Sequence, residues 1–230
     1  MLDYKRRFIE FMVRSHVLTF GDFVTKSGRD TPYFVNTGRY RTGEQISTLG
    51  EFYADAIESH VTDTGQAPDV LFGPAYKGIP LVVVTSAALA ARGRNVAFMF
   101  NRKEAKDHGE KGVLVGHEPS DGDRVLYVED VTTAGTSIRE TEPVLRAQAD
   151  IEVTGLAVSV DRFERYTDND TALSQLAREF DMATFAIVTA PEIIEHLEGR
   201  EIDGEVVLSP ARAQAMRDYL AEWGPKPATI

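Results

Sequence analysis

Two acidic residues, Glu129 and Asp130, stand between an apolar run and a loop of small residues. The run at 125–128 is typical of a buried strand, and the loop at 131–137 leads into a helical pattern. Such a loop can turn its N–H groups toward a phosphate, and the positive end of the helix adds to the attraction. Carboxylates would repel phosphate, so we expect them to face ribose hydroxyls, with Mg²⁺ held nearby. The pattern predicts a site for a phosphoribosyl group, although an ordinary strand–turn–helix has the same outline.

A second loop of this kind, at 72–78, follows the apolar run 70–72 and reads Phe-Gly-Pro-Ala-Tyr-Lys-Gly. Its N–H groups and Lys77 could bind a second anion. Taken alone, the segment could equally be an ordinary turn between a strand and a helix.

The segment 101–112 concentrates positive charge in a chain whose formal net charge is −11. A cationic loop in an acidic protein calls for a local reason, such as an anionic substrate. The loop also carries three acids, which is typical of a solvated surface loop. Its candidate anion-binding residues are Arg102, Lys103, Lys106, His108 and Lys111.

Two further features could bind a flat, charged ring. Tyr33 and Phe34, in the turn-rich segment 26–36, offer rings for stacking, although aromatic residues at such positions are often simply core. Arg162 follows the apolar run 156–160, and an arginine fork fits a carboxylate through two hydrogen bonds. The alternative interpretation is that Arg162 is an ordinary surface arginine.

The elements that must position these residues are indicated by apolar spacing. Helical spacing at 4–16 and 43–59 flanks a segment of short strands and loops at 21–40. Short apolar runs then alternate with helical patterns, which favours a mostly parallel sheet covered by helices on both faces. The runs lie at 70–72, 96–100, 125–128, 156–160 and 185–188, and the helical patterns at about 78–92, 137–149 and 170–180. The sequence predicts one α/β domain over 1–230, with N-terminal helices and a small hood at about 1–63, a core at about 64–190 and C-terminal helices at about 191–230.

Composition excludes several classes of protein. No apolar stretch approaches the roughly 18 residues that span a bilayer. The chain has no cysteine, which removes disulfides and thiolate chemistry and fits a cytosolic protein. Its acidic balance argues against binding to long nucleic acids, because phosphate neutralisation dominates that affinity.

The segment 125–137 resembles the PRPP-binding signature of the type I phosphoribosyltransferases. The segments 26–36, 72–78 and 101–112, together with Arg162, resemble orotate phosphoribosyltransferases in kind and order. The resemblance implies the type I phosphoribosyltransferase fold, a cis peptide at Ala75–Tyr76, Mg²⁺ held mainly through PRPP and water, and a homodimer with shared active sites. It also implies transfer of the phosphoribosyl group of PRPP to orotate, in pyrimidine nucleotide synthesis.

Residue roles follow from the same resemblance by position. Lys103, His108 and Asp130 are implied in catalysis. Orotate is expected at Lys26, Phe34, Val35, Thr133 and Arg162. PRPP and its pyrophosphate are expected at Lys26, Tyr76, Lys77, Arg102, Lys103, Lys106, His108, Glu129, Asp130, Val131, Thr132, Thr133, Ala134, Gly135, Thr136 and Ser137.

Two alternatives remain open at this point. The chain could be a phosphoribosyltransferase for another base, such as adenine or uracil, against which the segment 26–36 and Arg162 argue. It could also be a PRPP-sensing regulator that keeps the fold without catalysis, against which the cationic loop and the acidic charge argue.

Overall fold

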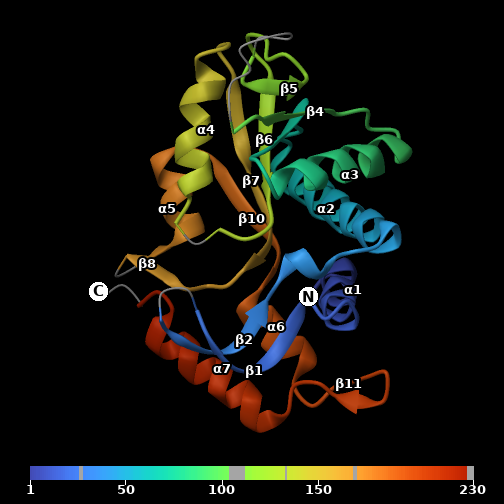
Figure 1. Ribbon diagram of the computed structural model, residues 1–230, viewed down its shortest axis with the longest axis vertical. Helices are drawn as coiled ribbons and strands as arrows, with labels where there is room; N and C mark the ends of the chain where they lie inside the picture. Colours follow the sequence, from blue (N-terminus) through green and yellow to red (C-terminus); the bar gives the residue numbers. More distant parts are fainter. Residues whose placement is uncertain (26–27, 104–111, 133, 168–169, 227–230) are drawn as a thin grey trace.

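A six-stranded sheet forms the centre of the computed structural model, which describes residues 1–25, 28–103, 112–132, 134–167 and 170–226 (Figure 1). Neighbouring strands are parallel except for the edge pair β4–β5, which is antiparallel. In spatial order the strands are β10 (Ala183–Thr189), β7 (Glu152–Asp161), β6 (Arg124–Glu129), β3 (Val70–Gly73), β4 (Ala97–Asn101) and β5 (Leu114–Gly116). The predicted α/β architecture is confirmed, and each of the five apolar runs forms a parallel strand. The three-residue strand β5 was not predicted because it is too short to carry a periodic pattern.

The order of the strands reverses between β3 and β6. The chain passes from β3 outward to β4 and β5, and then returns across β3 to β6, β7 and β10. Where the strand order reverses, the loops that follow the two neighbouring strands run in opposite directions and a crevice opens between them. Open α/β sheets bind their ligands in such a crevice. The two predicted anion-binding loops follow β3 and β6, so the topology brings them together.

Helices cover both faces of the sheet (Figure 1). On one face lie α2 (Gly43–Thr64) and α3 (Gly78–Ala91), and on the other lie α4 (Thr136–Arg146) and α5 (Ala172–Glu179). Successive residues of a strand point to opposite faces, so Leu126 and Val128 join the core under α2 and α3, whereas Val125 and Tyr127 join the core under α4 and α5. Within the described part of the chain, no helix is both long and apolar enough to cross a bilayer.

A smaller unit, the hood, lies below the carboxyl end of the sheet in Figure 1. It contains the antiparallel hairpin of β1 (Leu18–Val24) and β2 (Asp30–Val35), and the C-terminal helix α7 (Pro210–Trp223), which packs on β2. Tyr33 of β2 meets Tyr219 of α7 edge to face, with ring centroids 6.2 Å apart. The hood is therefore built from the N-terminal hairpin together with a helix from the other end of the chain.

The remaining elements connect these units. Helix α1 (Asp3–Arg14) packs against α2 and α6 (Ala190–Leu197), and a single 3₁₀ turn, η1 (Thr37–Arg39), links β2 to α2. The described residues also form two short antiparallel strand pairs, β8 (Arg165–Thr167) with β9 (Asp170–Thr171), and β11 (Glu201–Ile202) with β12 (Glu205–Val206).

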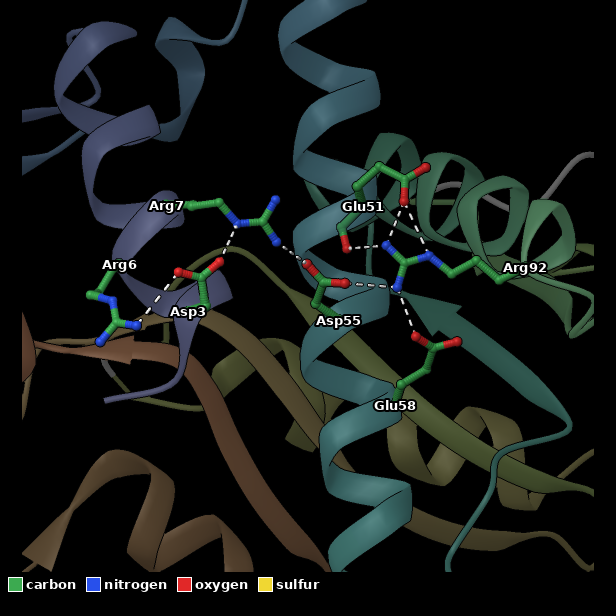
Figure 2. A network of polar contacts seen from close by, with 7 residues as sticks. All are labelled: Asp3, Arg6, Arg7, Glu51, Asp55, Glu58 and Arg92. Carbon is green, nitrogen blue, oxygen red and sulfur yellow. Dashed lines mark hydrogen bonds and ion pairs between the residues drawn. The ribbon is translucent and has the colours of Figure 1, made fainter.

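An ion-pair network joins α1 and α2 to the end of α3 (Figure 2). Arg92, which follows α3, contacts the three carboxylates of Glu51, Asp55 and Glu58 along α2. Asp55 is also 3.6 Å from Arg7 of α1. The Arg92 side chain is only 25% exposed, so its pairs are less screened by water than ordinary surface pairs.

Candidate active site

The carboxylate pair at the end of β6 diverges in the structure. The Oε1 atom of Glu129 accepts a hydrogen bond of 2.6 Å from Ser137 Oγ, on the α4 side of the sheet. The Oδ2 atom of Asp130 accepts one of 2.6 Å from Thr37 Oγ1 and one of 2.7 Å from Lys77 Nζ, on the α3 side. The alternation of side chains along an extended strand explains why two consecutive acids have different partners.

The backbone beneath the carboxylates is held by two hydroxyl groups. Tyr53 of α2 donates a hydrogen bond of 2.5 Å to the carbonyl oxygen of Glu129. Ser159 of β7 donates one of 2.6 Å from Oγ, and one of 2.9 Å from its N–H, to the carbonyl oxygen of Asp130. These contacts fix the direction in which both acids leave the sheet.

Glu129 has an unusual protonation behaviour. Burial, which disfavours the charged form, raises the pKa of its carboxyl group to about 7, and the nearby charge of Asp130 acts in the same direction. The hydrogen bond from Ser137 and the charge of Lys77 oppose the shift. The protonation of Glu129 therefore changes within the physiological range.

The loop after β6 turns into α4 through Gly135. Gly135 takes a left-handed conformation at the start of α4, with φ of 66°, and its N–H donates to Thr132 Oγ1 at 3.1 Å. A Cβ atom at Gly135 would lie 2.5 Å from a methyl group of Leu176, so that side chain of α5 would have to shift. Arg139 of α4 donates a hydrogen bond to the carbonyl oxygen of Ala134. Of the residues predicted in this loop, Thr133 lies outside the described residues.

The loop after β3 closes tightly on itself. A Cβ atom at Gly73 would lie 2.3 Å from the carbonyl oxygen of Gly78, so the start and end of the loop touch through backbone alone. The Ala75–Tyr76 peptide is cis, as the resemblance implied. The N–H of Ala75 donates a hydrogen bond of 2.8 Å to Asn101 Oδ1, which ties this loop to the end of β4.

The cationic loop begins where β4 ends. The N–H of Arg102 donates to the carbonyl oxygen of Val113 at 2.7 Å, and its guanidinium donates to that of Gly112 at 2.9 Å. The ammonium of Lys103 lies 6.0 Å from the ring centroid of Tyr76, which places it beside the loop after β3. Lys106 and His108 lie outside the described residues, as does Lys26 of the hairpin.

A cavity of about 500 Å³ opens between these loops and the hood. It brings together seven of the predicted site residues. They are Phe34, Val35, Lys77, Asp130, Val131, Thr132 and Arg162. The other predicted residues that the structure describes do not line this cavity. They are Tyr76, Arg102, Lys103, Glu129, Ala134, Gly135, Thr136 and Ser137.

Aromatic rings lie at one end of the cavity. The ring of Phe34 lies 5.6 Å from that of Phe23 across the hairpin, at an interplanar angle of 32°. The guanidinium of Arg162 lies over the ring of Tyr33, 4.6 Å from its centroid. Tyr33 is fully buried, so it serves as the support of Arg162, whereas Phe34 is the aromatic residue that reaches the cavity.

The cavity also contains residues that the sequence motifs did not predict. Arg29, Asp161, Glu164 and Arg165 contribute to its wall. Burial raises the pKa of the Asp161 carboxyl group. The Nη1 atom of Arg165 is buried and makes no hydrogen bond within the described residues. Charged residues of this kind are common on surfaces, and only their position at the strand ends distinguishes them.

The oxygen atoms of the acids suit a hard divalent cation. Mg²⁺ prefers carboxylate, phosphate and water oxygens, and usually binds through one or two carboxylates together with substrate phosphates. Among the residues that the structure describes, three or more potential ligands do not gather into a metal site of their own. The carboxylates of Glu129 and Asp130 are oxygen donors of the kind that Mg²⁺ prefers.

Known proteins are similar to this chain in sequence and in fold. The family model described as "Phosphoribosyl transferase domain" matches residues 44–193. The orotate phosphoribosyltransferase of Clostridium beijerinckii is 53% identical, and the match covers 98% of this chain and 100% of that protein. The enzyme of Clostridium acetobutylicum is 51% identical, with the same coverage. The crystal structure of orotate phosphoribosyltransferase from Francisella tularensis has a TM-score of 0.79 and 34% identity, covering 95% of this chain and 99% of that one. The chain belongs to the orotate phosphoribosyltransferase family.

Proposed function

We propose that the protein uses this cavity to transfer the phosphoribosyl group of PRPP to N1 of orotate, giving orotidine 5′-phosphate and pyrophosphate. One observation carries the proposal. The loops after β3 and β6 meet at the reversal point of the sheet, with Asp130 bonded to Lys77 between them and Arg162 in the same cavity. The two loops would bind the two phosphate-bearing ends of PRPP, with the acid between them. The arginine at one end of the cavity would bind the carboxylate of orotate.

PRPP would extend from one loop to the other. Its 5′-phosphate would bind the N–H groups and hydroxyls of the loop after β6, where the start of α4 attracts negative charge. The ribose hydroxyls would donate to Glu129 and Asp130. The pyrophosphate would bind at Tyr76 and Lys77, and would recruit the positive charges of the cationic loop and of Lys26. The 5′-phosphate loop would use Val131, Thr132, Thr133, Ala134, Gly135, Thr136 and Ser137, and the cationic loop Arg102, Lys103, Lys106 and His108.

Orotate would occupy the end of the cavity beneath the hood. Its flat ring would stack near Phe34 and Val35, and its carboxylate would face Arg162, whose fork suits a planar anion. Lys26 and Thr133 would complete this subsite. The neighbouring Phe23 holds Phe34 from behind, so the wall of the subsite is packed rather than loose.

The chemistry would depend on stabilising the departing pyrophosphate. As the bond from C1′ to the pyrophosphate breaks, negative charge grows on the leaving group and positive character grows on the ribose. Lys77 and Lys103 would neutralise the former, and Asp130, held by Thr37, would hold the ribose in position. His108 would supply charge or transfer a proton. Bound Mg²⁺ would add charge neutralisation at the phosphate oxygens.

The proposal extends to a homodimer that shares its active sites. Helix α3 supports it, because residues 78–91 contain no charged side chain, yet Val83 is 39% exposed. A helix that is apolar all round is normally covered, and a second copy of the chain would cover this one. We place the enzyme in the cytosol, which the cysteine-free sequence fits.

The test is a direct assay. Purified protein is mixed with orotate, PRPP and Mg²⁺, and the loss of orotate absorbance is followed, with adenine and uracil as parallel substrates and EDTA as a control. Consumption of orotate alone, abolished by EDTA, is the expected result. PRPP binding without turnover would instead support a regulator, and turnover of another base would contradict the assignment of Arg162.

A further inference from the structure

Glu164 lies in the cavity wall beside Arg162, two residues further along the chain. Its Oε1 atom accepts a hydrogen bond of 2.8 Å from Arg162 Nε and one of 2.6 Å from Arg162 Nη2. The two side chains are 11% and 18% exposed, so the pair is largely withdrawn from water and is stronger than a surface ion pair.

Glu164 also receives groups from two distant segments. Tyr219 of α7 donates a hydrogen bond of 2.7 Å to Oε1, across 55 positions of the chain. Arg29, just before β2, donates one of 3.4 Å to Oε2. The guanidinium of Arg29 is itself stacked 4.4 Å from the ring centroid of Trp223. The Glu164 carboxylate thus connects Arg162, in the cavity wall, to the hairpin and to the C-terminal helix of the hood.

These contacts leave one part of the Arg162 guanidinium open. Glu164 takes the Nε edge, and the buried ring of Tyr33 covers one face. Nη2 also donates a hydrogen bond of 3.4 Å to Thr31 Oγ1, and the hydroxyl of Tyr33 donates to the Arg162 carbonyl oxygen at 3.3 Å. Arginine has five N–H donors in a rigid fork, and Nη1 makes no hydrogen bond to the described residues, so that end remains for another acceptor. The group of Arg29, Arg162 and Glu164 keeps one formal positive charge, which a single carboxylate would neutralise.

We propose that Glu164 is a positioning residue for the base substrate. It holds the Arg162 guanidinium by one edge, so that the other end presents donors to the carboxylate of a flat ring, and Tyr219 holds Glu164 in turn. This inference rests on the proposed function. The opposite arrangement, in which Glu164 occupies Arg162 and competes with the substrate, predicts the opposite change in affinity.

The test compares Glu164→Ala with Glu164→Gln. Initial rates are measured with orotate and PRPP varied separately, and orotate binding is measured by calorimetry. Loss of hydrogen bonds to a charged group should raise the orotate KM of Glu164→Ala at least about tenfold. The PRPP KM and kcat should change less than about threefold, because Glu164 contacts neither the phosphate loops nor the reacting carbon. Glu164→Gln keeps an oxygen acceptor for Arg162 and should recover most of the orotate affinity.

Two further variants separate positioning from general destabilisation. Tyr219→Phe removes only the hydroxyl that holds Glu164, and should raise the orotate KM by about two- to fivefold. Arg217→Ala, on the same helix but paired with Glu198, should leave both KM values unchanged. A normal or lower orotate KM in Glu164→Ala would overturn the inference while wild-type turnover of orotate keeps the proposed function. A wild-type protein that does not consume orotate would overturn the proposed function itself.

Discussion

The ammonium of Lys77 lies 2.7 Å from Oδ2 of Asp130, so that a cation of the loop after β3 is bonded to an acid of the loop after β6. Thr37 Oγ1 completes the contact at 2.6 Å from the same oxygen. The Lys77 side chain is 67% exposed, whereas that of Asp130 is only 13% exposed. Lys77 can therefore leave Asp130 for a pyrophosphate at little cost, and Asp130 stays in place.

Replacing Lys77 with glutamine should weaken PRPP binding selectively. We expect the PRPP KM to rise at least about tenfold, because a charge-assisted contact to pyrophosphate is lost. The orotate KM should change less than about twofold, since Lys77 lies at the other end of the cavity. Initial rates with each substrate varied, and inhibition by pyrophosphate, measure both effects. Lys226→Gln is the matched control, and equal losses for both substrates would contradict the assignment of Lys77.

Replacing Glu129 with glutamine should change how stability depends on pH. The pKa of Glu129 is raised to about 7 in the folded protein from an ordinary value of 4.5, so the folded state binds more protons between these values. Stability is then greatest below the lower value and falls as pH rises through about 7, where the buried group must ionise. The Glu129→Gln variant should therefore be more stable than wild type at pH 8, by on the order of 2 kcal/mol. At pH 4.5 it should show no such gain in stability.

Urea unfolding at several pH values checks this prediction. Glu198→Gln is a suitable control, because Arg217 holds the pKa of Glu198 below its ordinary value, and its removal should not stabilise the protein at high pH. A constant difference between Glu129→Gln and wild type across the range would show that the carboxyl group does not titrate as described.

Replacing Lys103 with alanine should reduce turnover without reducing stability. Lys103 is exposed, and its contact with Tyr76 is a distant one, with the ammonium 6.0 Å from the ring centroid. Loss of a charge that acts on the leaving pyrophosphate should lower kcat by about 100-fold. Thermal unfolding should be unchanged. Turnover equal to that of wild type would remove Lys103 from the chemistry, and Lys226→Ala controls for the loss of one positive charge.

Replacing Arg92 with methionine should destabilise the fold and leave the site intact. Three carboxylates of α2 would lose their shared partner, as Figure 2 makes plain, although Arg7 still reaches Asp55. We expect the free energy of unfolding to fall by about 2 kcal/mol, and by less in high salt, which screens the repulsion. Arg217→Met breaks a more exposed pair and should destabilise the protein less than Arg92→Met does. The rate per folded molecule should be normal in both variants.

Much of the fold is determined by local sequence patterns. Runs such as 125–128 are apolar at every position, as a strand covered on both faces requires, and the intervening helical patterns supply the cover. The motif residues could likewise be recognised, because a strand, two acids and a loop of small residues are contiguous in the chain. Very short strands such as β5 carry too few residues to form a pattern.

Tertiary structure decided which of these residues meet. Glu129 and Asp130 are adjacent in sequence, yet strand alternation sends them to Ser137 and to Lys77 on opposite sides of the sheet. The contact of Glu164 with Tyr219 joins a loop at the sheet to the last helix, which carried no motif. A motif identifies residues that are contiguous in the chain, whereas the pKa of Glu129 and the placement of Arg162 depend on burial and on partners that only the packed chain brings within hydrogen-bonding distance.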